Sequence, residues 1–168
     1  MKLTVLILIV AAFSMSAQPK PDAQIEAMKK LDYMAGDWQG EGWIDMGGQR
    51  ITFKGGEKVQ RKLNGVALLV EGSFFSESGM PVHTTLAVIS YDPKGKKYDF
   101  NTWLAQGTTG DHELKLTDNG WYWELHPPGA GTIRFTMTLQ DGQWVEIGER
   151  SVDGTSWKKF FEMKLKKT

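Results

Sequence analysis

The chain has 168 residues, with 20 basic and 20 acidic side chains, three histidines and no cysteine. This length suits one domain with a sizeable core, and the absence of cysteine excludes disulfides and thiolate metal sites. The balanced charge lacks the basic footprint that nucleic-acid binding requires, so we expect no nucleic-acid partner.

The first residues, Met1 to Ala17, have the pattern of a secretory signal peptide. Lys2 precedes an apolar run from Leu3 to Phe13, and small residues follow up to Ala17. The run is too short to cross a bilayer. We therefore expect an exported protein, periplasmic or extracellular, cleaved near Ala17 and without a membrane span.

Residues 18–35 are expected to form a linker and a short helix, and 36–168 a single barrel domain. Asp22 is placed to cap the helix, apolar residues recur at helical spacing from Ile25 to Leu31, and Gly36 is placed to end it. Alternating, strand-like segments follow at 37–45, 50–63, 66–76, 81–91, 96–105, 111–118, 121–126, 132–139, 143–151 and 156–166.

The connections between these segments are short and rich in Gly, Asn and Asp. Five suit two-residue hairpin loops that need a positive φ: Gly47-Gly48, Asn64-Gly65, Asn119-Gly120, Asp141-Gly142 and Asp153-Gly154. The pattern predicts an all-β fold, an antiparallel up-and-down, calycin-like β-barrel of about ten strands with a short N-terminal helix.

Two-residue loops also fix the pairing register, and this predicts which face of each strand is outside. Opposite charges then face each other in all five hairpins, as in Glu41/Lys54, Lys58/Glu71, Lys115/Glu124, Arg134/Glu149 and Glu149/Lys158. Apolar residues share the other face, as in Gly42/Phe53, Leu116/Trp123 and Val59/Val70. The charge-paired face is therefore expected to be the outer one.

Several polar residues nevertheless fall on the inner face. Buried ionisable groups are costly unless paired or hydrated, and a ten-stranded barrel is wide enough to leave a lumen. The predicted ligand-binding residues are Trp38, Glu57, Arg61, His83, Thr85, Thr102, His112, Trp123, Glu146 and Arg150. Lys159 and Trp157 also fall on this face. For Arg61 and Lys159, a position at the rim in water is an equal alternative.

The chain direction sorts these residues by height. His83, His112 and Arg150 fall toward one end, which we expect to be the entrance; Trp38 and Trp144 fall toward the helix, which we expect to be the closed end. This assignment leaves Leu86 and Trp103 outside, unless a bulge inverts the face of their strands.

The segment Gly36-Asp37-Trp38 resembles the Gly-x-Trp signature of lipocalins and other calycins. In that superfamily the Trp packs at the closed end, often beneath an Arg, so the resemblance implies that Arg61 stacks on Trp38. Lipocalins offer an Arg late in the last strand, where this chain has Lys158 and Lys159.

A fuller resemblance covers most of the chain after Ala17. It is to the bacterial DUF1579-like, lipocalin-like families of unassigned function, and is carried by Gly36 to Gly42, Ile89-Ser90-Tyr91-Asp92 and Ser151-Val152-Asp153-Gly154 before Trp157. The start is also similar to nitrobindin, a ten-stranded barrel that binds haem through a His near its C-terminus. No His follows His126, so haem bound in that way is not expected.

Other motifs indicate little chemistry. The three histidines show no metal-binding spacing, so no metal is predicted, and no nucleophile elbow or phosphate-binding loop is present.

The first hypothesis is an exported barrel that holds an apolar or amphipathic small molecule, with an anionic head at Arg150 and the histidines. The alternatives are an isomerase- or hydrolase-type enzyme that uses Glu57, Glu146 or a His, and an envelope scaffold with a filled barrel and a functional outer surface around Trp43 and Trp103. A monomer or a dimer fits each.

Overall fold

The computed structural model describes residues 21–168, and the predicted signal peptide lies outside them. A helix α1 (Asp22–Met28) continues into a 3₁₀ helix η1 (Lys29–Met34), and a short 3₁₀ turn η2 (Leu63–Gly65) follows the second strand. The ten strands are β1 (Gly36–Met46), β2 (Gln49–Lys62), β3 (Ala67–Phe75), β4 (Pro81–Asp92), β5 (Lys97–Leu104), β6 (Thr109–Thr117), β7 (Gly120–Leu125), β8 (Thr132–Gln140), β9 (Gln143–Ser151) and β10 (Lys158–Lys167).

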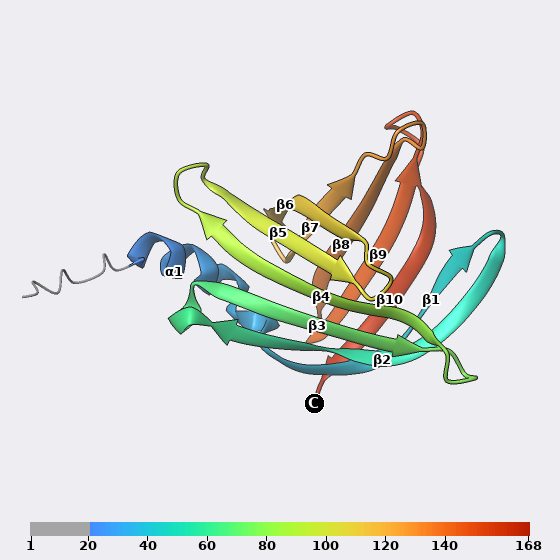
Figure 1. Ribbon diagram of the computed structural model, residues 1–168, viewed down its shortest axis with the longest axis horizontal. Helices are drawn as coiled ribbons and strands as arrows, with labels where there is room; N and C mark the ends of the chain where they lie inside the picture. Colours follow the sequence, from blue (N-terminus) through green and yellow to red (C-terminus); the bar gives the residue numbers. More distant parts are fainter. Residues whose placement is uncertain (1–20) are drawn as a thin grey trace, which may run out of the picture.

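The strands form a closed antiparallel barrel in which each strand pairs with its neighbour in sequence (Figure 1). The last strand closes the barrel on the first, in a register that runs from Trp38 opposite Lys167 to Ile44 opposite Phe161. The predicted fold is therefore confirmed. Closure leaves no exposed strand edge, and it divides every strand into an inner and an outer face.

Three of the five predicted hairpin registers are confirmed. Glu41 lies opposite Lys54, Lys58 opposite Glu71, and Arg134 opposite Glu149. The assignment of β4 and β5 is confirmed as well, because the large hydrophobic residues Leu86 and Trp103 are exposed while Thr102 is buried.

Two registers were predicted wrongly. Lys115 lies opposite Tyr122 instead of Glu124, and Leu116 opposite Trp121. The reason is Gly120, which belongs to the strand: a Cβ there would collide with the Met137 carbonyl, so this glycine serves a close approach rather than the turn. The shift is by two residues, and the faces are unchanged.

The second wrong register is at the start of β10. Arg150 lies opposite Lys158, and Glu149 opposite Lys159, because the register shifts between Lys159 and Phe161. A bulged residue inverts the alternation on one side of it. Lys159 therefore points outward and donates to Glu162 on the outer face at 2.8 Å, which corrects its predicted inner position.

The N-terminal helices lie at one end of the barrel, beside the turns that join β2 to β3 and β4 to β5 (Figure 1). Met28, Leu31 and Met34 are buried in the same core as the strands. Asp22 is the first helical residue rather than the cap, which is Pro21, and the helical segment ends at Met34. Within residues 21–168, no helix is long and apolar enough to span a membrane.

Candidate ligand site in the barrel lumen

The helix end of the lumen is a packed floor of tryptophans. Trp38 donates its indole N–H to the Met34 carbonyl at 2.8 Å, and the Trp121 indole N–H points at the Met34 sulfur at 3.3 Å. Trp144 lies edge-on to both, with ring centroids 5.7 Å from Trp38 and 6.3 Å from Trp121. All three indoles are at most 3% exposed, so this end is closed.

The cation over Trp38 is Lys167, from the last strand, and not Arg61. The Lys167 ammonium lies 5.2 Å from the Trp38 ring centroid and donates to the Tyr33 carbonyl at 3.2 Å. Arg61 instead forms an ion pair with Asp32 of η1, and both side chains are exposed to water. The sequence prediction for Arg61 is corrected accordingly: it ties the helix to the rim and does not face a lumen ligand.

Above the floor, aromatic rings follow the inner wall without sealing it. The Trp123 ring stacks on Phe135 with a centroid distance of 4.9 Å, and it lies 4.5 Å from His112 and 5.3 Å from Phe100. Trp123, Phe135 and His112 are only half-buried, whereas Phe100 is buried. The accessible part of the inner wall is therefore aromatic, as is typical of pockets for small organic ligands.

Glycines make room for these rings. A Cβ at Gly148 would lie 2.9 Å from both Phe135 and Phe161, and a Cβ at Gly55 would lie 2.9 Å from Phe74. The rings of Phe135 and Phe74 thus occupy space that a side chain on the neighbouring strand would need. This lets large side chains line the wall at the cost of little lumen volume.

Two carboxyl groups lie where the aromatic wall meets the floor. Glu57 of β2 lies opposite Trp38 and is 8% exposed; Glu146 of β9 accepts a hydrogen bond from the Trp144 indole N–H at 3.1 Å. One carboxylate oxygen of Glu57, Oε2, is buried without a hydrogen-bond partner. Since such an unpaired buried acceptor costs free energy, it requires an explanation.

Burial is the main cause of a raised pKa for both carboxyls. Burial raises the pKa of Glu57 to about 8, and the charge of Glu146 adds to the rise. Burial also raises the pKa of Glu146 to about 7, against the opposing effect of the Trp144 hydrogen bond. Glu146 is nevertheless half-buried by surface, which places it at the boundary between the accessible lumen and the packed floor.

The space beside Glu57 depends on a glycine in the next strand. A Cβ at Gly72 would lie 2.7 Å from both Glu57 Oε1 and Thr85 Oγ1, and 2.8 Å from Glu57 Oε2. The hydroxyl of Thr85 and the carboxyl of Glu57 therefore converge on one point of the inner wall. Thr85 is half-buried, so this point is reached from the accessible part of the lumen.

The inner histidines lie nearer the open end. His112 Nε2 is 3.4 Å from the Thr102 hydroxyl, and the His83 ring is 6.2 Å from Phe74. Burial lowers the pKa of both histidines, so they are neutral at pH 7. As neutral rings they can donate or accept a hydrogen bond, but they attract no anion.

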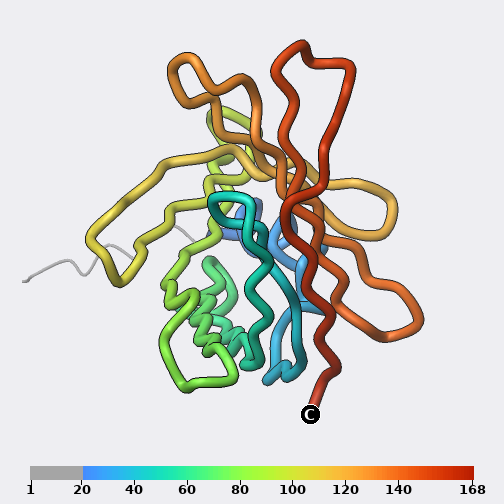
Figure 2. Tube along the Cα trace, turned by 90° about the vertical axis from the view of Figure 1, so that its right-hand side faces the viewer, coloured from blue at the N-terminus to red at the C-terminus, as the bar shows by residue number. Residues whose placement is uncertain are grey.

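The remaining predicted residues lie at the rim or outside. Arg150 is exposed, with its guanidinium 5.7 Å from the Phe160 ring centroid. Trp157, predicted to point inward, precedes β10 and is covered by the outward Arg134 at 4.2 Å. In Figure 2 the loop between β9 and β10 (red) extends from the barrel at the top of the molecule.

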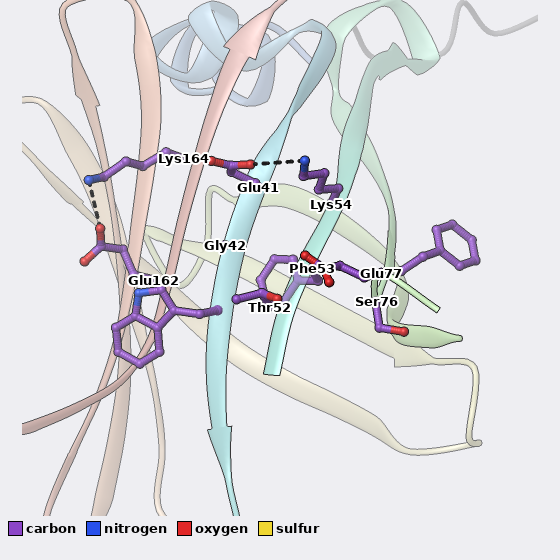
Figure 3. A pocket seen from close by; sticks show the side chains of 11 residues that line it. Glu41, Gly42, Thr52, Phe53, Lys54, Ser76, Glu77, Glu162 and Lys164 are labelled. Atoms are coloured by element: carbon purple, nitrogen blue, oxygen red, sulfur yellow. Dashed lines mark ion pairs between the residues drawn. The ribbon is translucent and has the colours of Figure 1, made fainter. Parts of the chain in front are cut away.

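Two hollows mark the outer surface, and neither includes the carboxyl pair. One, of about 740 Å³, lies over β1, β2 and β10 and is lined by Glu41, Gly42, Trp43, Thr52, Phe53, Lys54, Phe75, Ser76, Glu77, Glu162 and Lys164 (Figure 3). Four of its charged side chains are paired with each other, Lys54 with Glu41 at 3.8 Å and Lys164 with Glu162 at 2.9 Å. The other, of about 470 Å³, lies between η1 and the β6–β7 turn.

We place the candidate site in the lumen because there an unpaired buried polar atom, Oε2 of Glu57, lies beside accessible aromatic wall. The other such atom within residues 21–168 is the hydroxyl of Tyr33, a residue that lines the smaller surface hollow. Among residues 21–168, no group of three or more His, Cys, Asp or Glu side chains is arranged to hold a metal. The site therefore consists of two carboxyls, one hydroxyl and an aromatic wall, which suits binding of an organic molecule or proton transfer to one.

Comparisons with known proteins show the fold and no more. No family model and no curated protein matches the chain. The crystal structure of Rv2717c from M. tuberculosis is similar, with a TM-score of 0.61 and 10% identity over 84% of this chain and 97% of that chain. The protein is a closed ten-stranded antiparallel β-barrel. Its resemblance to the DUF1579-like families stays a prediction.

Sequence reasoning placed both glutamates on the inner face as acid/base candidates, without fixing the distance between them. It also missed the buried Trp121 and Phe100, although Trp121 shares its face with Trp123 two residues on. The proximity of Glu57 and Glu146 depends on the β1–β10 closure, for which no turn supplies a register.

Proposed function

We propose that the protein binds a small organic molecule in the upper part of the barrel lumen. The observation that carries this proposal is the buried, unpaired oxygen of Glu57 at the base of a half-buried aromatic wall. A binding site explains its cost, because a ligand that donates a hydrogen bond there would satisfy the group. The packed tryptophan floor supplies the rigid support that such a site needs.

The proposed ligand has an apolar or aromatic body and one polar end. Its body would lie against Trp123 and Phe135, and its polar end would reach Glu57, Glu146 and Thr85. The cation that an anionic group would meet on the rim is Arg150, and Lys167 at the floor is engaged with Trp38 and the Tyr33 carbonyl, so the polar end that reaches Glu57 is a hydrogen-bond donor. His83, His112 and Thr102 line the path between rim and floor.

We further propose that the protein acts outside the cytoplasm. The support is the pattern of Met1 to Ala17, which has the basic start, apolar run and small residues of a signal peptide. Mass determination of the mature protein purified from its source tests this: loss of the first 17 or so residues is expected, and retention of Met1 to Ala17 contradicts it.

The binding proposal is tested with a neutral aromatic probe and two neighbouring threonines. Thr85 faces the lumen beside Glu57, whereas Thr84 pairs with the exposed Ser73 on the outer face. Equilibrium dialysis should show that tryptophol binds the wild type and T84W but not T85W, whose indole fills the site. Circular dichroism checks that both variants fold.

Native mass spectrometry of protein purified without unfolding provides the second arm of this test. It should detect a co-purified small molecule in the wild type that T85W lacks. Absence of any ligand, together with tryptophol binding that T85W leaves unchanged, would contradict a lumen site.

A second candidate function is acid–base catalysis. It is favoured by the pKa values of about 8 for Glu57 and about 7 for Glu146, which suit proton transfer near neutral pH. Screening of co-purified or structurally related compounds for isomerisation or hydrolysis, with E57Q and E146Q as controls, tests it. Turnover that either substitution abolishes would favour an enzyme over a binding protein.

A further inference from the structure

We propose that the lumen selects ligands that carry a protonated amine on an aromatic or apolar body, with the ammonium group held between Glu57 and Glu146. This inference rests on the proposed binding function and adds the chemical class of the ligand. It follows from the convergence of the Glu57 carboxyl and the Thr85 hydroxyl on one point of the inner wall, where one oxygen of Glu57 has no partner. Glu146 is close enough for its charge to act on Glu57.

The nearby positive charges are engaged elsewhere and do not neutralise this pair. Lys167 lies over the Trp38 ring and donates to the Tyr33 carbonyl, and Arg61 is paired with Asp32. Arg150 is at the exposed rim against Phe160. The site therefore has two acidic groups and lacks the counter-charge that buried carboxylates require.

The other elements that face Glu57 and Glu146 contribute neutral groups. Trp38 of β1, Thr85 of β4 and Trp144 of β9 lie around them, and His83, above Thr85 on the same strand, is neutral because burial lowers its pKa. An ammonium group brings three N–H donors and one positive charge. It would therefore supply both the missing hydrogen bond and the missing charge.

The aromatic wall supports the same class of ligand. Trp123, Phe135 and Phe100 present ring faces and edges toward the lumen, and aromatic faces attract cations as well as apolar groups. An arylalkylamine would thus stack its ring on the half-buried wall while its amine reaches the carboxyls. An arylalkyl carboxylate of the same size would place its charge against two acidic groups.

Three probes that share an indole ring and differ in the polar end separate these cases: tryptamine, tryptophol and indole-3-acetate. Isothermal titration calorimetry at pH 7.5 should show tryptamine binding at least tenfold more tightly than tryptophol, and indole-3-acetate more weakly than both. In E57Q and E146Q the preference for tryptamine over tryptophol should fall several-fold, because tryptamine loses more affinity than tryptophol does. E71Q, which removes an exposed carboxyl from the outer face of β3, is the matched control and should retain the preference.

The number of protons released on ligand binding is a measurement that a purely structural role of Glu57 would not affect. At pH 6 the raised pKa values of Glu57 and Glu146 leave both mostly protonated, so binding of a cation should release close to one proton to the buffer, detected as a difference in binding heat between phosphate and bis-Tris buffers. The release should be reduced in E57Q.

The outcomes separate the inference from the proposal on which it rests. Tryptophol binding with no preference for tryptamine, or an equal preference in E57Q and E146Q, overturns the amine class but leaves lumen binding. A preference for indole-3-acetate also overturns it. If none of the three probes binds, the inference and the lumen site fail together.

Discussion

Replacement of Glu57 by Gln should change how the stability of the barrel depends on pH. Glu57 has a pKa of about 8 in the folded protein against an ordinary value of 4.5, because burial and Glu146 disfavour its charge. Between these values the folded protein holds a proton that the unfolded chain releases. The free energy of unfolding therefore falls as the pH rises, by about 1.4 kcal/mol per pH unit for this group.

The size of this pH-dependent loss of stability follows from the difference between the folded and unfolded pKa values of Glu57. From pH 5 to pH 8, Glu57 should reduce the free energy of unfolding by up to about 4 kcal/mol, a reduction that E57Q lacks because its amide stays neutral. At pH 5 the amide replaces a protonated carboxyl of the same shape, so wild type and E57Q should be similar. At pH 8 E57Q should be the more stable protein.

Urea unfolding, followed by tryptophan fluorescence at pH 5, 6, 7 and 8, measures this difference. The difference between E57Q and wild type should grow steadily with pH, while E71Q on the outer face runs parallel to the wild type. A difference that is constant across the range would refute the reasoning, because it would mean that Glu57 is ionised in the folded protein throughout.

Three further predictions concern packing and the turns. G148A should cost about 1–3 kcal/mol, because its Cβ would lie 2.9 Å from two phenylalanine side chains; a stability within 0.3 kcal/mol of wild type in urea unfolding would contradict the packed wall. K167M should lose about 0.5–1 kcal/mol of cation–π stabilisation over Trp38, whereas K166M on the outer face should be neutral, and equal melting temperatures would refute this role. D153A should lower the melting temperature at pH 7, because the carboxylate of Asp153 accepts hydrogen bonds from two backbone N–H groups, which hold its pKa well below the usual range. This stabilisation is present above the ordinary carboxyl pKa and is progressively lost as the pH falls below it. A loss of melting temperature in D153A that is as large at pH 2 as at pH 7 would contradict this role.

The sequence predicted the strands well because its turn residues act locally. Asp141-Gly142 and Gly47-Gly48 adopt the positive φ that tight hairpins need, and both registers were correct. The same rule gave the wrong register for β6 and β7, because Gly120 does not have a positive φ and instead allows the close packing of β7 on β8. A glycine required for a turn and a glycine required for close approach look alike in a sequence.

The candidate site was only partly predictable, for a topological reason. Alternation along β2 and β9 placed Glu57 and Glu146 inside, and the structure confirms this. Their proximity arises from the pairing of β1 with β10, which joins the two ends of the chain without a loop. Likewise, the bulge before Phe161 turns Lys159 outward, and no residue type in that segment predicts a bulge.

The central claim is that Glu57 and Glu146 form a buried carboxyl pair that receives a ligand cation. Carbon-13 NMR of the two side-chain carboxyls, titrated with and without tryptamine, tests it most directly. Without tryptamine the pair should titrate near pH 7 to 8, and with saturating tryptamine at least one midpoint should fall by a pH unit or more. Midpoints near 4.5 in the free protein, or midpoints that saturating tryptamine leaves unchanged, would contradict the claim.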